Sequence, residues 1–237
     1  MGKGLVPLCG YDWNEMLHRV FMNDSCDLVV DVGANFGLAV LPAVAKQFRV
    51  LAFEPIPLNL EVLQTNIWVN GWDVDTVGIV PAGVSESSGS TTIYVPMNAE
   101  DNSAIGNDAS VATRNLGGSA IPMPIQLVSI DEYFNKADST LLDTVRLFKI
   151  DVQGHELPVL RGMETLLSAG DRRFVLFVEV DTELQQAAGH GPKDIEEYML
   201  SLGWNAYCIR KSGIRLGSDC YDVVFIHESR VSEARMT

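Results

Sequence analysis

The sequence predicts an α/β protein built on a doubly wound, mostly parallel sheet of about seven strands. Short apolar segments of strand length alternate with amphipathic segments of helix length along most of the 237 residues. This alternation is typical of a parallel sheet with helices on both faces. The first strand runs directly into a turn of small residues and then into a helical segment. The last two strand-like segments, 205–209 and 221–226, can form an antiparallel ribbon at the sheet edge.

The first strand, 28–32, is an apolar run interrupted only by Asp31. The turn after it consists of small residues around one phenylalanine: Gly33, Ala34, Asn35, Phe36 and Gly37. Glycines at such a turn let the backbone approach a ligand that a Cβ would keep away. Ligands of open α/β sheets bind at the carboxyl ends of the strands, where this turn lies. The alternative is an ordinary turn between a strand and a helix.

The second strand, 49–53, ends at Glu54 and Pro55. An acidic residue about 20 residues beyond a glycine turn, at the tip of the second strand, can accept the two hydroxyls of a ribose. Pro55 and Pro57 favour an extended exit before the next helix. The alternative for Glu54 is a solvated loop carboxylate.

The other elements follow from apolar periodicity and from residues that end helices. Pro42 removes a backbone donor, so the helix after the glycine turn should start late or kink. Ser129 and Glu132 form a capping box that opens a short helix through Phe134, which makes Asp131 and Glu132 structural. Further helices are predicted over 60–67, 157–167 and 195–202, and further strands over 74–80, 125–128, 145–150 and 174–180.

Two segments are set apart from this core. Residues 1–27 carry apolar residues at helical spacing and are predicted to form a covering helix before a domain of residues 28–237. Residues 86–124 are too long for a plain connection, so we interpret them as a substrate-facing insertion or lid. Small residues before that insertion, ending at Ser85, would leave room for a flat adenine ring, although a simple turn explains them equally well.

Composition and charge exclude several classes of protein. A net charge of −14 without a basic stripe argues against a nucleic-acid substrate. No apolar run reaches the ~18 residues of a membrane span, and the first residues lack a secretory apolar core. Four scattered cysteines, with no C-x-x-C pair, indicate reduced thiols in a cytoplasmic protein; a luminal disulfide protein is the alternative. The sequence sets no oligomeric state.

Three segments together resemble the FkbM family of methyltransferases. The turn does not fit the dinucleotide pattern G-x-G-x-x-G, because Asn35 and Leu38 stand at glycine positions, but D-x-G-x-N-x-G resembles the first motif of class I S-adenosylmethionine (SAM) methyltransferases. The other two segments are 53–55, F-E-P, and 149–156, K-I-D-V-Q-G-H-E. The resemblance covers about 28–181 and departs at Gln153, where the family often has Glu.

The resemblance implies a Rossmann-like class I methyltransferase fold, SAM as methyl donor, and O-methylation of a small metabolite such as a sugar or polyketide. The predicted cofactor-binding residues are Asp31, Gly33, Ala34, Asn35, Gly37, Glu54, Pro55 and Ser85. The alternatives are a nicotinamide-dependent oxidoreductase, suggested by the acid after the second strand, and a non-catalytic protein that keeps the fold.

The catalytic candidates are Asp151, His155, Glu156 and Glu179. Asp151 and His155 come at the end of a central strand and should face the crevice. Histidine is the usual base for a hydroxyl proton because its pKa lies near neutral. Asp151 could orient the hydroxyl, take the proton, or bind a divalent ion with Glu156 and Glu179; it could also simply cap a helix. Because these carboxylates need not converge, no metal site is predicted. His190 and His227 lie outside any motif and receive no role.

Overall fold

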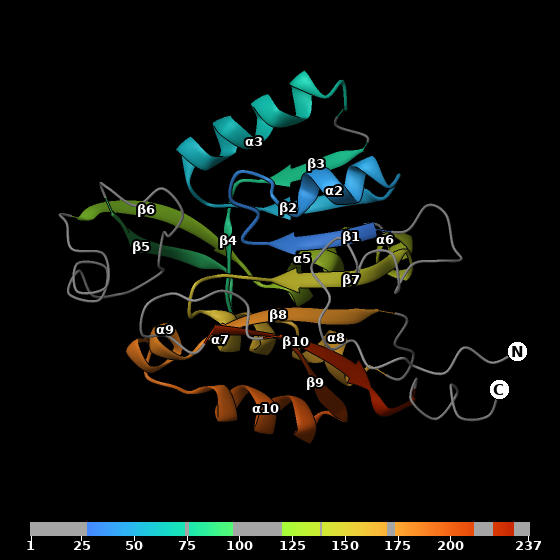
Figure 1. The fold of residues 1–237 in the computed structure, drawn as a ribbon, viewed down its shortest axis with the longest axis vertical. Coiled ribbons are helices and arrows are strands. Elements are labelled where there is room, and N and C mark those ends of the chain that lie inside the picture. The colour runs from blue at the N-terminus through green and yellow to red at the C-terminus, as the bar shows by residue number, and fades with distance from the viewer. Residues whose placement is uncertain are drawn as a thin grey trace, which may run out of the picture.

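A seven-stranded sheet forms the centre of the computed structural model, in which the strands follow the order β3-β2-β1-β7-β8-β10-β9 (Figure 1). The strands are β1 (Leu28–Val32), β2 (Arg49–Phe53), β3 (Val77–Val80), β7 (Val145–Ile150), β8 (Val175–Asp181), β9 (Trp204–Arg210) and β10 (Cys220–His227). β10 pairs antiparallel with β8 and β9, whereas β1, β2, β3, β7 and β8 pair in parallel. The predicted doubly wound sheet and its antiparallel edge ribbon are therefore confirmed. The structure describes residues 28–73, 76–96, 120–137, 139–169, 174–210 and 220–229.

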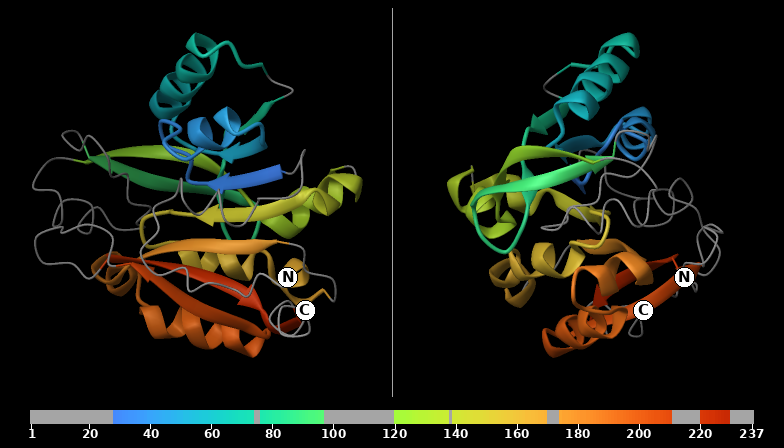
Figure 2. Two further views of the ribbon diagram at one scale, coloured as in Figure 1. Left: turned by 45° about the vertical axis from the view of Figure 1, so that its right-hand side comes forward. Right: turned by 90° about the vertical axis from the view of Figure 1, so that its left-hand side faces the viewer.

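Helices cover both faces of the sheet (Figure 2). Apolar residues of α2 (Val40–Ala45) and α3 (Pro57–Val69) pack on one face. Residues of α5 (Ile130–Lys136), α6 (Ser139–Asp143), α7 (Glu156–Arg161), α8 (Glu164–Ser168) and α10 (Pro192–Ser201) pack on the other. Both faces of the central strands are thus buried. This explains why four of the five residues of β1 are apolar and why all five, including Asp31, are buried. The short helix α9 (Thr182–Ala187) follows β8 directly.

The helix predicted over 157–167 is divided into α7 and α8 at Gly162. A Cβ on Gly162 would lie 2.0 Å from the carbonyl oxygen of Ser85, so the absence of a side chain lets these two segments touch. Asp131 accepts hydrogen bonds from the backbone N–H groups of Thr165 and Leu166 and so starts α8. This contact confirms the structural role predicted for Asp131. The late start predicted for the helix after the glycine turn is also confirmed, since α2 begins at Val40.

A second, three-stranded sheet lies beside the main one (Figure 1). Its order is β4 (Gly83–Val84), β6 (Ala120–Val128), β5 (Gly89–Pro96), with β4 parallel and β5 antiparallel to β6. The two ends of the predicted insertion are therefore paired strands. The rest of that insertion, 97–119, and the covering helix predicted within 1–27 lie outside the described residues. Within the described ranges, no helix has both the length and the apolar character that crossing a membrane requires.

Candidate functional site

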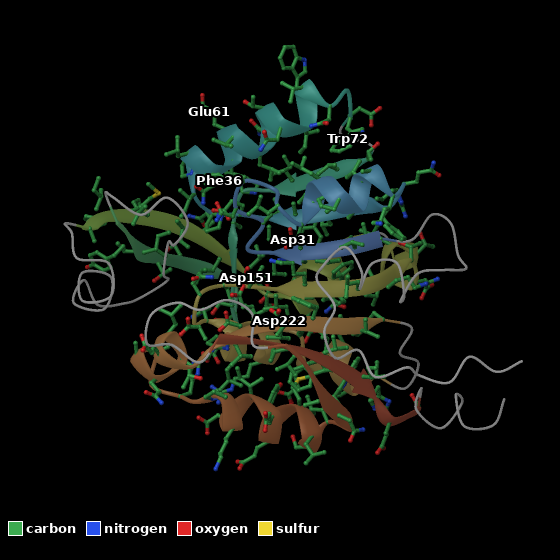
Figure 3. The ribbon with its side chains drawn as sticks, in the orientation of Figure 1. Asp31, Phe36, Glu61, Trp72, Asp151 and Asp222 are labelled. Atoms are coloured by element: carbon green, nitrogen blue, oxygen red, sulfur yellow. The ribbon has the colours of Figure 1, made fainter. Side chains whose placement is uncertain are left out.

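The carboxyl ends of β1 and β7 are in direct contact. Gly33 has φ +85°, and a Cβ there would lie 2.0 Å from the carbonyl oxygen of Asp151. The turn continues through Asn35 with φ 50° and Gly37 with φ +94°. A glycine is therefore required at position 33 for two reasons, the left-handed backbone and the close approach of the neighbouring loop. Figure 3 shows Asp31 near the carboxyl end of β1 and Asp151 just beyond the end of the adjacent β7.

Lys149 links two carboxylates across this edge. Its Nζ lies 3.5 Å from Oδ1 of Asp31 and 3.2 Å from Oδ2 of Asp151. Asp31 is only 1% exposed, and this burial raises its pKa, although the charge of Lys149 acts in the opposite direction. Burial alone would lower the pKa of Lys149, but the charges of Asp151 and Asp31 raise it above its usual value. Lys149 was not among the predicted site residues, although a lysine between buried strand residues indicates a nearby negative charge.

Gln153 orients Asp151 from the other side. Its Nε2 donates to Oδ1 of Asp151 at 2.8 Å. Burial opposes ionisation of Asp151, but the charge of Lys149, the interaction with Glu179 and the hydrogen bond from Gln153 outweigh it and hold the pKa of Asp151 below its usual value. Because an ionised carboxylate only accepts hydrogen bonds, the amide nitrogen of Gln153 must face it. A glutamate at this position could not donate that bond, which gives the departure at Gln153 a physical meaning.

Glu54 joins the end of β2 to the glycine turn. Its carboxylate accepts hydrogen bonds from the backbone N–H of Asn35 at 2.9 Å, the backbone N–H of Ile56 at 2.9 Å and Nδ2 of Asn59 at 3.1 Å. Burial raises its pKa while these bonds oppose the rise. Glu54 is therefore not a solvated loop acid. Pro55 follows it in the extended segment that leads to α3, as the sequence analysis expected.

Most backbone donors of the glycine turn are used within the protein. The N–H groups of Gly33 and Ala34 both donate to the carbonyl of Phe53 at 3.0 Å, and that of Gly37 donates to Ala34. At the ends of β1 and β7, four buried acceptor atoms lack a hydrogen bond within the described ranges: both carboxylate oxygens of Asp31, Oδ1 of Asn35 and Oε1 of Gln153. Buried polar atoms normally have partners, so this group of acceptors marks a place where a ligand with donor groups would fit.

His155 is paired with Ser85. Ser85 Oγ lies 3.0 Å from His155 Nε2, and Ser85 is buried. Burial, assisted by the charge of nearby His190, lowers the pKa of His155 to about 4. Ser85 was predicted to lie beside adenine and His155 on the acceptor side, but in the structure the two side chains are in contact. His190, in the loop after α9, received no role because it lies outside every motif, yet both its ring nitrogens are buried without a hydrogen bond from the described residues.

Glu156 lies beneath the loop that carries Asp151 and His155. It is 1% exposed and accepts hydrogen bonds from the N–H groups of Val152 and Gly154 at 3.0 and 3.1 Å and from the side chain of Gln185. Burial raises its pKa to about 7. Glu179, on β8, is half-buried and contributes to the charges around Lys149. Among the described residues, no group of three or more potential ligands has an arrangement suited to a metal ion.

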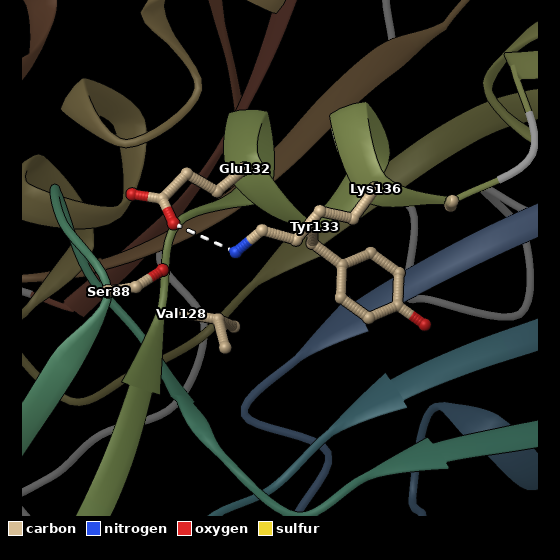
Figure 4. A pocket seen from close by; sticks show the side chains of 6 residues that line it. Ser88, Val128, Glu132, Tyr133 and Lys136 are labelled. Carbon is tan, nitrogen blue, oxygen red and sulfur yellow. Dashed lines mark hydrogen bonds and ion pairs between the residues drawn. The ribbon is translucent and has the colours of Figure 1, made fainter.

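A cavity of about 360 Å³ lies elsewhere, between the second sheet and α5 (Figure 4). It is lined by Ser88, Val128, Glu132, Tyr133, Lys136 and Ala137. Lys136 pairs with Glu132 at 3.3 Å across its wall. None of the strand-end residues described above lines this cavity, so it is separate from the candidate site.

The strand order, the antiparallel β10 and the glycine turn after β1 define a class I methyltransferase fold. The methyltransferase FkbM domain matches residues 31–205 of the sequence. The chain therefore belongs to the FkbM methyltransferase family, and the resemblance inferred from its motifs is confirmed.

Relatives and solved structures agree with this assignment. Methyltransferase sdnD of Sordaria araneosa is 31% identical over 157 residues, 57% of this chain and 60% of that protein. Hexuronic acid methyltransferase AglP of Haloferax volcanii is 30% identical over 174 residues, 73% of this chain and 61% of that protein. The chain thus spans about three fifths of the length of these relatives.

Among solved structures, the methyltransferase FkbM of Methylobacillus flagellatus KT has a TM-score of 0.56 at 17% identity, over 91% of this chain and 48% of that one. The magnesium protoporphyrin IX methyltransferase ChlM of Synechocystis PCC 6803, solved with bound SAM, has a TM-score of 0.52 at 11% identity, over 91% of this chain and 78% of that one. At these identities the likeness concerns the fold.

Proposed function

We propose that this protein transfers a methyl group from SAM to a hydroxyl of a small metabolite such as a sugar or polyketide. The observation that carries the proposal is the group of acceptor atoms at the ends of β1 and β7, supplied by Asp31, Asn35 and Gln153. SAM presents an α-ammonium group and a positively charged sulfonium, and both are complemented by buried acceptors and a carboxylate. A methyl acceptor of uronic acid type is suggested by the relative AglP, a hexuronic acid methyltransferase.

In this proposal Asp31 and Glu54 bind different parts of the cofactor. Asp31 would receive the ammonium group, because its oxygens have no hydrogen bond from the described residues. Glu54 would accept the ribose hydroxyls, because its Oε2 carries only the bond from Asn35 N–H and a carboxylate oxygen accommodates about two. Gly33 and Gly37 shape the turn, and Ala34 adds a small buried side chain. When bound, SAM supplies an electrophilic methyl group.

Asp151 and His155 serve the acceptor hydroxyl. Asp151 stays ionised and fixed by Lys149 and Gln153, so it can accept a hydrogen bond from the hydroxyl and orient its oxygen. The proton can leave to Asp151 directly, or through Ser85 to the neutral ring of His155, whose Nε2 faces Ser85 Oγ. In this arrangement Ser85 belongs to the acceptor side. Glu156 keeps the loop in shape and Glu179 supports Asp151, so neither needs to touch the acceptor.

The test is transfer of label from methyl-labelled SAM to a panel of hydroxyl acceptors that includes hexuronic acids, neutral sugars and polyketide alcohols. Wild type should label a hydroxyl, and Asp151→Asn should lower turnover about 10²–10⁴-fold, the usual value of a positioned base. Its control is Asp143→Asn, on an exposed position of α6 that precedes β7, at the opposite end of that strand from Asp151. Label that enters a carboxylate rather than a hydroxyl, or full activity of Asp151→Asn, would contradict the proposal.

A further inference from the structure

Lys149 occupies an unusual place for a lysine, a central strand of the sheet. Its side chain is 13% exposed, and its chain neighbours Phe148 and Ile150 are fully buried. A lysine in such surroundings loses its proton unless negative charges compensate for lost hydration. Here the compensation comes from the two carboxylates at 3.5 and 3.2 Å, those of Asp31 and Asp151.

The sheet register fixes these three groups on one face. Asp31 of β1 is the direct register partner of Lys149 of β7. Asp151 follows Lys149 by two residues and so projects to the same side of the sheet. The ammonium therefore lies between a carboxylate assigned to the cofactor and a carboxylate assigned to the acceptor. Neither assignment explains why a cation should join them.

The other charged groups that face Lys149 are also acidic. The charge of Glu179 on β8 raises the pKa of Lys149, as do those of the two aspartates. Asp222 of β10 is the register partner of Glu179 and shares its face of the sheet (Figure 3). The charge of Asp151 raises the pKa of Asp31, which means that the two carboxylates disfavour each other's ionisation. Without the ammonium, this mutual repulsion would favour protonation of one of the two carboxylates.

We propose, building on the function proposed above, that Lys149 is a positioning residue that holds Asp31 and Asp151 ionised together. It thereby couples binding of the cofactor at Asp31 to the ionised state of Asp151, which receives the acceptor hydroxyl. The cofactor's ammonium then meets a carboxylate that needs to release no proton. The acceptor hydroxyl meets a second carboxylate held in place by the same cation. Lys149 acts through these two groups and touches neither substrate.

The first arm of the test counts protons during binding of S-adenosylhomocysteine, by calorimetry in buffers of different ionisation enthalpy. Wild type should exchange almost no protons, and its affinity should change little between pH 6 and pH 9. Lys149→Met should release about one proton per ligand, and its affinity should be at least about tenfold lower at pH 6 than at pH 9. Lys149→Arg keeps the charge and should behave as wild type does. Lys149→Met with unchanged affinity and no proton release would overturn the proposal.

The second arm needs no ligand. In Lys149→Met the carboxylate pair holds a proton that the unfolded chain gives up at lower pH, so its stabilising effect is lost as pH rises. The loss of stability relative to wild type should therefore grow between pH 5.5 and pH 8.5 in urea unfolding, whereas a loss from packing would be the same at every pH. A constant difference would overturn the proposal.

One further variant keeps the test decisive if Lys149→Met does not fold. Asp31→Asn/Lys149→Met removes one carboxylate together with the cation, so it should fold and should lose the pH-dependent difference. If that double variant is no better folded than Lys149→Met, the charge-balancing role is refuted. Should wild type bind neither SAM nor S-adenosylhomocysteine while the pH-dependent difference persists, the proposed function fails and the role of Lys149 in holding the carboxylates stands.

Discussion

The residues at the strand ends show how burial and pairing set protonation. Asp31, Asp151 and Lys149 compensate one another by ion pairing, whereas His155 is buried against a neutral hydroxyl. A buried imidazole that gains no opposite charge stays neutral. The pKa of His155 is therefore about 4 instead of the near-neutral value expected of a base from the sequence. If His155 receives the acceptor's proton, the acid limb of kcat/KM should lie near pH 4.

His155 should also make the fold sensitive to acid. Its pKa is depressed in the folded state from 6.5 to about 4, so the unfolded chain binds the proton first and stability falls as pH drops through that range. At pH 4.5 the loss from this residue is about 2–3 kcal/mol. Urea unfolding of wild type and His155→Gln at pH 7 and pH 4.5 measures it. The variant should lose less stability on acidification; an equal loss would show that His155 is not the group responsible.

Glu54 is expected to serve both the fold and the ligand. Glu54→Gln replaces an acceptor oxygen by an NH₂ group, so one of its backbone donors, Asn35 N–H or Ile56 N–H, loses its partner. An unsatisfied buried donor costs about 1–3 kcal/mol. We expect a loss of that size in urea unfolding and at least a tenfold loss of SAM affinity in calorimetry. Glu61→Gln, on the exposed side of α3, is the control and should change neither. Unchanged SAM affinity in Glu54→Gln would remove this residue from the cofactor site.

At the scale of elements, the join between α7 and α8 positions the acceptor side. Gly162 allows the backbone of Ser85 to lie against this join, and Ser85 in turn contacts His155. The join between the two helices therefore helps to position Ser85 and His155. The spacing of apolar residues in the sequence could not predict this backbone contact. The apolar pattern over 157–167 predicted one helix correctly in its buried face and wrongly in its continuity.

Gly162→Ala should accordingly be costly. Its Cβ would meet the carbonyl oxygen of Ser85 at 2.0 Å, and the backbone of Ser85 is held by its N–H bond to the carbonyl of Val128. Overpacking of this kind costs about 1–3 kcal/mol. Gly89→Ala is a matched control, because a Cβ there meets nothing within 4 Å. Thermal and urea unfolding of both variants would measure the difference, and a Gly162→Ala protein as stable as Gly89→Ala would mean that the contact with Ser85 yields easily.

At the scale of the whole molecule, the sequence was sufficient to predict the fold class. It was insufficient to predict which side chains of the site contact one another. Buried parallel strands are apolar almost without interruption, so β1, β2, β7 and β8 could be recognised along the chain. Their order in the sheet was not predicted. The ion pairs of Lys149 and the contact between Ser85 and His155 join residues from different elements. Such contacts depend on register and on close backbone approach, which single-sequence patterns do not contain.

Ligand-induced stabilisation of the whole molecule can separate the functional hypotheses. A ligand that binds only the folded state stabilises it by RT ln(1 + [L]/Kd), about 2.7 kcal/mol at a hundredfold excess over Kd. For a chain of this size, that corresponds to roughly 5–10 °C in Tm. SAM and S-adenosylhomocysteine should produce such a shift and NAD should not, because Asn35 stands where a pyrophosphate-binding turn needs glycine.

Asp31→Asn should lose most of the Tm shift caused by SAM, since it removes the charge that complements the ammonium. The control Asp73→Asn should retain that shift, because Asp73 lies in the turn after α3, away from the carboxyl ends of the strands. A shift with NAD but none with SAM would favour the oxidoreductase, and a shift with neither would favour a protein that has kept the fold without the activity.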